Sequence, residues 1–274
     1  MQLQKAAGAI GAYVVDVALA DVAQSDALFA QVHTALLEHA VLFFREQELA
    51  PPDFQAFARR FGQIEGHPAY ATVPGAPDVQ ILESTAEEPS KIEAWHTDMT
   101  FRSAPPAITL LHGQIIPPYG GDTLWASTAA AYESLSQPIR QLLDALEAVH
   151  DFRHGFAESL AESGGTERLA EAVAANPPVT HPLVCAHPET AKKVIYVNAL
   201  FTTHIVGLSK AESTMLLEFL YRHIVTEEFV VRLNWQPNTV AIWDNRLTQH
   251  KPVNDYFPQH RRMHRVTISG VAPV

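Results

Sequence analysis

The chain has 274 residues, of which 47% are hydrophobic and 18% charged, and its formal net charge is -11. This composition excludes a disordered chain, and the acidic balance argues against a nucleic-acid partner because no basic stripe could neutralise phosphates. Cys185 is the only cysteine and no apolar run is long enough to span a bilayer, so we expect a cytoplasmic protein without a membrane partner.

The first third of the chain mixes strand patterns with amphipathic helix patterns. One helix pattern follows Ser25 and Asp26, with apolar residues at helical spacing along one face. A second begins with proline and has glycine just past its end, as helices commonly do. We expect strands over Gly11–Val17 and Ala40–Arg45, and helices from Asp26 and over Pro51–Gly62.

The middle of the chain is richer in strand patterns. The stretch 158–176 is the exception: it is rich in alanine and glutamate, holds Gly164 and Gly165, and has little strand character, so we interpret it as an inserted helical arm or lid. We expect strands over Val79–Leu82, His96–Phe101, Ala107–Ile116 and Asp122–Ser127, followed by two helices within Thr128–Ala148.

The last third reads as a hairpin, a helix and more strands. Ser209 is placed to cap the helix. We expect the hairpin within His181–Asn198, the helix as far as about His223, and strands over Phe229–Trp235, Thr239–Asn245 and His264–Val271, the first two joined through Gln236, Pro237 and Asn238.

Many strands, with a few helices placed outside the strand runs, favour a mainly β fold with flanking helices, arranged as a two-sheet sandwich. The helices do not alternate regularly with the strands, which makes a doubly wound parallel sheet the weaker alternative. We find no internal repeat, low-complexity tract or linker, so we expect one domain over residues 1–274.

The segment Lys91–Phe101 places His96 two residues before Asp98. Alternate residues of a strand share a face, so the pair would present an imidazole and a carboxylate side by side. One more histidine would complete a two-histidine, one-carboxylate site, which suits ferrous iron in oxygenases. A sheet histidine hydrogen-bonded to a nearby aspartate is the ordinary alternative. Spacing alone does not choose the third ligand among His181, His187, His204, His223, His250, His260 and His264.

The motifs WHTDMTF, GGDTLWAS, WDNRLTQH and HRRMHRVTISG occur in the order and approximate spacing of the taurine dioxygenase (TauD/TfdA) family, which the chain resembles from about Ile10 to Gly270. The resemblance implies a double-stranded β-helix, or jelly roll, and an Fe(II)- and 2-oxoglutarate-dependent dioxygenase that uses O2 and associates into dimers or tetramers. It assigns the iron to His96, Asp98 and His250, and the distal carboxylate of 2-oxoglutarate to Thr123 and Arg261.

The resemblance also implies a substrate pocket with a polar and an apolar end. Arg265 and the segment HPAY, from His67 to Tyr70, would bind an anionic group, and Arg265 lies four residues beyond Arg261 on the same strand face. Plain core packing is the ordinary alternative for the apolar set. That set comprises Met99, Phe156 and Phe201.

One position departs from the family pattern. Ile92 stands about where taurine dioxygenases carry an asparagine that helps to hold the substrate amine, and a carbon-lined position would leave an ammonium unpaired. The sequence therefore predicts hydroxylation next to the sulfonate of taurine or a related alkanesulfonate, releasing sulfite and an aldehyde. The alternatives are the same chemistry on an alkyl sulfate or an aryloxyalkanoate, a zinc hydrolase, and a non-catalytic binding protein.

Overall fold

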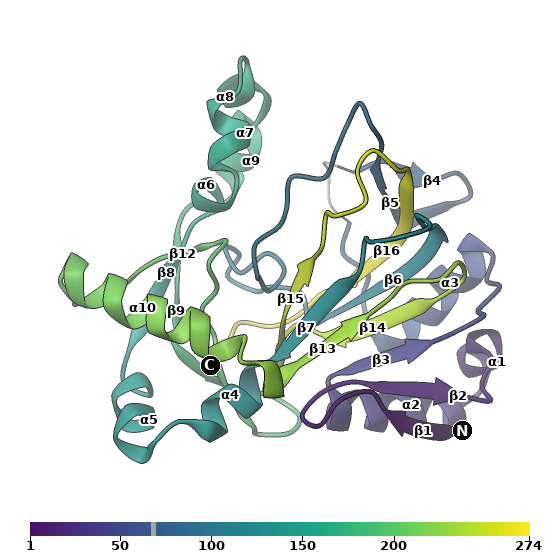
Figure 1. The fold of residues 1–274 in the computed structure, drawn as a ribbon, viewed down its shortest axis with the longest axis horizontal. Coiled ribbons are helices and arrows are strands. Elements are labelled where there is room, and N and C mark those ends of the chain that lie inside the picture. Colours follow the sequence, from purple (N-terminus) through teal and green to yellow (C-terminus); the bar gives the residue numbers. More distant parts are fainter. Residues whose placement is uncertain (67–69) are drawn as a thin grey trace.

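The computed structural model describes residues 1–66 and 70–274, and its centre is a large β-sheet faced by a small one (Figure 1). Neighbouring strands are antiparallel in both sheets, except that β2 and β3 run parallel. The large sheet has the order β1 (Gln2–Lys5), β2 (Ala12–Val15), β3 (Val41–Phe44), β14 (Val240–Asp244), β6 (Ile108–Ile115), β16 (Arg261–Ile268), β5 (Ala76–Ser84), β4 (Thr72–Val73), and the small sheet β13 (Val230–Leu233), β7 (Thr123–Ser127), β15 (Thr248–Pro252).

The packing of strand β14 explains why most of its sequence is apolar. Val240 and Ile242 point to the outer face of the large sheet, where they join the core beneath the N-terminal helices. Ala241 and Trp243 point inward and pack with Trp125 of the small sheet. Both faces are therefore buried, which removes the alternation of a half-exposed strand. The outer helices are α1 (Leu19–Gln24), α2 (Asp26–His39) and α3 (Pro51–Ala58), with the 3-10 turn η1 (Arg59–Phe61).

A second group of elements lies beside the small sheet (Figure 1). Helix α10 begins with a capping box, in which Ser209 and Glu212 satisfy each other's backbone N–H groups. No helix within residues 1–66 and 70–274 is long and apolar enough to cross a bilayer. This group comprises α4 (Thr128–Ser134), α5 (Gln137–Leu143), β8 (Glu147–His150), β9 (Val179–Pro182), β10 (Val184–Ala186), β11 (Lys193–Ile195), β12 (Thr202–Ile205), α10 (Lys210–Ile224) and η2 (Glu227–Phe229).

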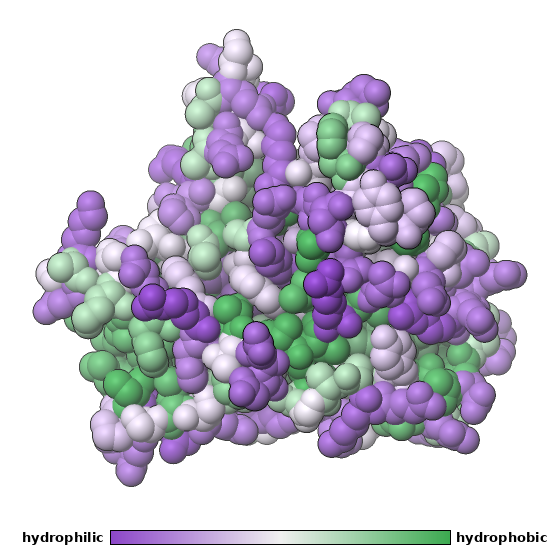
Figure 2. Space-filling view, in the orientation of Figure 1, coloured by the Kyte–Doolittle hydropathy of each residue, from purple (hydrophilic) through white to green (hydrophobic). Residues whose placement is uncertain are grey.

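A helical arm projects from this second group (Figure 1). Its elements are short, and the surface of the arm is largely hydrophilic in Figure 2, where a notch separates it from the neighbouring projection of the molecule. Its role as a lid stays a prediction. The arm comprises α6 (Phe152–Gly155), α7 (Ala157–Ala161), α8 (Gly165–Arg168) and α9 (Ala170–Ala175).

The predicted two-sheet architecture with flanking helices is confirmed, but several local predictions are wrong. Residues 98–101 form a turn rather than a strand, with His96 in an isolated β-bridge to His250, and the end of the predicted helical stretch Thr128–Ala148 belongs to strand β8. The turn at Pro237 does join two strands, yet β13 and β14 lie in different sheets. In the predicted hairpin, β10 and β11 pair with each other. Strands β1, β4, β12 and β15 and helix α1 had no clear signal, since each is short and several are polar.

A buried ion pair anchors the end of β14. Asp244 is fully buried, and its Oδ2 accepts a hydrogen bond from Arg246 Nη2 at 2.6 Å and lies 3.0 Å from His187 Nε2. Burial raises the pKa of Asp244, but the hydrogen bonds from Arg246 and His187 outweigh it and leave the pKa below its usual value. The stabilisation is therefore present at neutral pH and is lost as the pH falls through this lowered pKa.

We expect Asp244→Ala to lower the free energy of unfolding by about 3–5 kcal/mol, because it removes the buried carboxylate that pairs with Arg246 and His187 and leaves Arg246 only the more exposed Glu189. Urea denaturation at neutral pH measures the change. The control is Asp53→Ala, which removes an exposed carboxylate in the first turn of α3. Equal midpoints for the two variants would contradict the assigned role.

Candidate active site

The candidate ligands His96 and His250 meet at the edge of the small sheet. The backbone N–H of His96 donates to His250 O at 3.0 Å, and that of His250 donates to His96 O at 2.7 Å. The two imidazole rings consequently lie 4.2 Å apart between centroids. Immediately afterwards the chain turns, and Met99 has the left-handed φ of 47°. The prediction that His96 and Asp98 share one face of a strand is therefore wrong. The turn instead brings the Asp98 carboxylate to the two imidazoles.

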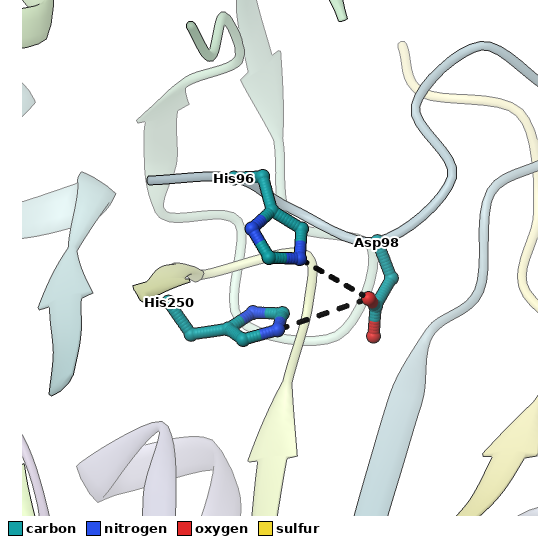
Figure 3. Close-up of side chains that lie close together, drawn as sticks. All are labelled: His96, Asp98 and His250. Atoms are coloured by element: carbon teal, nitrogen blue, oxygen red, sulfur yellow. Dashed lines mark ion pairs between the residues drawn. The ribbon is translucent and has the colours of Figure 1, made fainter. Parts of the chain in front are cut away.

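The three side chains converge on one point (Figure 3). Asp98 Oδ1 lies 3.8 Å from His96 Nε2 and 3.8 Å from His250 Nε2. Each distance is shorter than two metal–ligand bonds of about 2.1 Å, so one cation can contact both atoms. Within the described residues, this is the group of acidic, histidine and cysteine side chains whose donor atoms, all within 4.8 Å of one another, could hold a metal ion.

The protonation states also suit a cation. His96 Nδ1 donates to Ala94 O at 2.9 Å, which leaves the lone pair on Nε2 facing the site. Burial lowers the pKa of His96, and it lowers the pKa of His250 to about 3. Burial raises the pKa of Asp98, but its interactions with His250, Arg265 and His96 and the hydrogen bond from Thr109 outweigh burial, so the net pKa is lowered. The site thus offers two neutral nitrogens and one carboxylate at neutral pH.

Trp235 lies near both Thr123 and Arg261. Trp235 Nε1 donates to Thr123 Oγ1 at 2.9 Å, which leaves the hydroxyl proton of Thr123 available. The Arg261 guanidinium lies 5.9 Å from the rings of both Trp235 and Tyr256. Burial lowers the pKa of Arg261, and within residues 1–66 and 70–274 its Nε has no hydrogen-bond partner. Among the described residues no carboxylate forms an ion pair with it, so its charge is available to an anion.

Two glycines bring the backbone close to Arg261. Gly120 and Gly121 have φ values of 68° and 70°, in the left-handed region that favours glycine. A Cβ at Gly120 would lie 2.4 Å from Asp255 Oδ1, and one at Gly121 would lie 3.4 Å from Arg261 Cδ. The GGDT motif therefore forms a tight turn beside the arginine that larger residues could not form.

Arg265 lies nearer to the three candidate ligands, on the same strand as Arg261. Its Nε and Nη2 donate to Gln80 Oε1 at 3.0 and 2.8 Å, and its guanidinium stacks 4.6 Å from the centre of the Tyr70 ring. The positive charge of Arg265 contributes to the lowered pKa values of all three candidate ligands. The predicted contribution of His67 lies outside the described residues.

The predicted apolar residues form one cluster beside the metal site. Met99 and Phe201 are buried in it with Phe101 and Phe152, and Phe156 packs against them. The ring of Phe201 lies 6.5 Å from that of His96. Ala172 and Val173 of the arm pack against the same cluster. The base of the arm thus contributes to an apolar wall close to the candidate ligands.

Ile92 is half-buried and is not a member of that cluster. Asn254 Nδ2 donates to Ile92 O at 3.0 Å, which holds the segment before the metal motif against the loop between β15 and β16. The neighbouring Lys91 forms an ion pair with Glu162 of the arm. This contact joins the arm to the segment that carries Ile92.

Three supporting residues were missed from the sequence. Gln80 orients Arg265, while Thr109 and Asn245 connect to the second oxygen of Asp98. Asn245 belongs to the WDNR motif and could have been singled out there. Gln80 and Thr109 lie in ordinary strand patterns, and only the pairing of strands brings them to the site.

Comparison with known proteins gives a family model, two relatives and a solved structure that each match nearly the whole chain. A family model described as "Taurine catabolism dioxygenase TauD, TfdA family" matches residues 2–267. An alkylsulfatase of Acinetobacter baylyi is 40% identical over 98% of this chain and 85% of the relative. An alpha-ketoglutarate-dependent sulfate ester dioxygenase of Pseudomonas putida is 36% identical over 100% of this chain and 91% of the relative. The crystal structure of a taurine dioxygenase from Burkholderia xenovorans superposes with a TM-score of 0.85 at 37% identity, covering 100% of this chain and 90% of that one.

Proposed function

The chain belongs to the taurine catabolism dioxygenase TauD, TfdA family, and on that premise we propose that it hydroxylates the carbon bearing the sulfonate or sulfate-ester group of an alkyl chain. It is a 2-oxoglutarate-dependent dioxygenase, as its relatives are. One atom of O2 goes to the substrate and the other to succinate, with loss of carbon dioxide. Collapse of the hydroxylated product then gives an aldehyde together with sulfite from a sulfonate, or with sulfate from a sulfate ester.

Iron(II) is the metal that we propose for His96, Asp98 and His250. The donor set of two neutral imidazoles and one carboxylate fits it, and it leaves positions open for other ligands. When bound, iron supplies the activation of O2 that is coupled to oxidative decarboxylation of 2-oxoglutarate. The protein residues bind and orient the two organic molecules and exclude water from them.

We assign the distal carboxylate of 2-oxoglutarate to Arg261 and Thr123. Among the described residues no carboxylate forms an ion pair with the largely desolvated Arg261 guanidinium, so a carboxylate that arrives with the co-substrate can supply its counter-charge. Thr123 can add a hydroxyl hydrogen bond because its oxygen already accepts from Trp235. The co-substrate would therefore be oriented at the end farthest from its reacting keto acid.

The observation that carries the substrate class is the position of Arg265. Its charge acts on all three candidate ligands, and Gln80 holds its guanidinium from one side. An anionic substrate group bound there would place its attached carbon close to the metal. The cluster of Met99, Phe156 and Phe201 offers an apolar surface for a chain and excludes water.

Two features favour an unsubstituted alkyl chain over taurine. Ile92 offers no hydrogen bond to an ammonium from its side chain. The Acinetobacter and Pseudomonas relatives are named for sulfate esters. A cytoplasmic location and a dimeric or tetrameric assembly stay predictions from the sequence.

The test supplies iron(II), 2-oxoglutarate and air with an alkyl sulfate, with the alkanesulfonate of the same chain length, and with taurine. We expect release of sulfate or sulfite from the alkyl substrates, in step with succinate, at a kcat/KM about 10–100-fold above that for taurine. This range corresponds to about 1–3 kcal/mol for an ammonium left without a partner. Succinate, sulfate and sulfite are measured in one reaction by ion chromatography.

Controls without 2-oxoglutarate or without O2 separate the rival activities. Sulfate release that needs neither co-substrate would indicate a hydrolase and contradict the proposal. A preference for taurine would show that Ile92 does not exclude the amine. Phenol release from an aryloxyalkanoate, with neither sulfate nor sulfite from the alkyl substrates, would indicate that the substrate is a carboxylic acid and that the chemistry is the same.

A further inference from the structure

We propose that Thr109 and Asn245 are positioning residues that make Asp98 bind its metal through a single oxygen atom. They form a buried chain of hydrogen bonds that begins at Trp243. Trp243 Nε1 donates to Asn245 Oδ1 at 2.9 Å, and Asn245 Nδ2 donates to Thr109 Oγ1 at 2.8 Å. Thr109 Oγ1 in turn donates to Asp98 Oδ2 at 2.8 Å. We refer to these four side chains as the tryptophan relay.

The direction of every proton in the tryptophan relay is fixed by its first member. The indole N–H of Trp243 can only donate, so the amide of Asn245 must turn its oxygen toward it. The amide NH2 then faces Thr109 and donates to its oxygen. Thr109 has one hydroxyl proton, and with its oxygen already accepting a bond, that proton points to Asp98.

The two carboxylate oxygens of Asp98 therefore have different surroundings. Oδ1 faces both imidazoles, 3.8 Å from each Nε2, while Oδ2 points away and is held by Thr109 (Figure 3). A carboxylate that bound through both oxygens would occupy two coordination positions. With Oδ2 engaged, only Oδ1 is offered to the metal, so the further position stays open to co-substrate or O2.

Burial and packing make the tryptophan relay rigid. Thr109 and Asn245 are 0% and 1% exposed, so water does not compete for their hydrogen bonds. The backbone N–H of Asn245 donates to Ala107 O at 2.8 Å, which ties it to the start of β6. The ring of Trp243 also packs 4.9 Å from that of His250, so the same stretch supports two of the three ligands.

The inference rests on the proposed metal site, and its test uses cobalt(II) as a probe of affinity and geometry that needs no turnover. We expect Thr109→Val, which keeps the shape but removes the hydroxyl, to weaken cobalt(II) binding about 10–100-fold. The visible absorption of cobalt(II) bound to this variant should also change in intensity, because a carboxylate free to bind through both oxygens alters the coordination number of the metal. Titration followed by visible absorption measures both quantities.

Matched variants separate positioning from a general effect on folding. Thr109→Ser keeps the hydroxyl and should restore the affinity. Thr267→Val makes the same change at the buried threonine that pairs with Thr109 on β16, and should bind cobalt(II) like the wild type. Asn245→Asp acts without touching Thr109: its carboxylate would take the threonine proton, so it should weaken binding as Thr109→Val does.

The outcomes distinguish this inference from the proposed function. If the wild-type protein does not bind cobalt(II), the proposed metal site is contradicted. If the wild type binds cobalt(II), and Thr109→Val and Asn245→Asp bind it with the same affinity and spectrum, only the proposed positioning role of the tryptophan relay is contradicted. Near-UV circular dichroism establishes whether each variant is folded. If Thr109→Val does not fold, Asn245→Asp alone tests the positioning role.

Discussion

Replacing Asp98 with alanine is expected to reduce succinate formation with an alkyl substrate to the background rate and to abolish binding of a divalent cation. Asp98 supplies the one negative charge among the three candidate ligands, and its Oδ1 lies between the two imidazoles. Without it, two neutral nitrogens remain, which cannot hold a hard divalent ion against water. His96→Ala should have the same effect, because it removes one of those nitrogens.

The measurements are metal content after gel filtration, by mass spectrometry, and succinate formation under air. His204→Ala is the matched control, since it removes an exposed histidine of strand β12. The control should keep the metal content and activity of the wild type. Metal-dependent turnover at the wild-type rate in Asp98→Ala would refute the assigned site.

The fold could be predicted well from the sequence where hydrophobic pattern alone decides structure. Strands β3 and β14 are buried on both faces, and their apolar runs identified them. Strand β15 is different: its sequence, Thr248 to Pro252, is polar because one face carries a candidate metal ligand. Because this strand carries a functional residue, it lacks the hydrophobic pattern by which strands are recognised in a sequence.

The candidate ligands could be found, although the reason given for their proximity was wrong. The spacing of His96 and Asp98 suggested one face of a strand, whereas the chain turns at Met99. His250 could not be chosen by spacing, since its selection depends on a backbone pairing with His96 across more than 150 residues. Only the family resemblance singled it out.

The contacts of the supporting residues lay beyond prediction for a related reason. Asn245 stands in the WDNR motif, but its partner Thr109 is 136 residues away in the chain and lies in an ordinary strand pattern. Gln80 meets Arg265 because β5 pairs with β16, which is a property of sheet register. Hydrogen bonds between distant strands leave no local sequence signal, so they appear only when the strands are assembled.

Arg261→Ala is expected to raise the KM for 2-oxoglutarate about 100-fold or more. A guanidinium and a carboxylate form paired, charge-assisted hydrogen bonds of about 1.5–3 kcal/mol each, and the buried carboxylate would lose them all. The initial rate of succinate formation at increasing 2-oxoglutarate concentrations separates KM from kcat. Arg262→Ala is the matched control, because the neighbouring arginine pairs with Glu83 at the surface.

A second co-substrate shows whether the effect comes from the distal carboxylate itself. 2-Oxovalerate has the same chain length as 2-oxoglutarate and keeps the 2-oxo acid, but it ends in a methyl group. Wild-type protein should prefer 2-oxoglutarate by about 100-fold in kcat/KM, because only that co-substrate can pair with the guanidinium. In Arg261→Ala this preference should collapse, since the carboxylate then enters a pocket without its counter-charge. Persistence of the preference in the variant would place the carboxylate elsewhere and leave Arg261 as a structural residue.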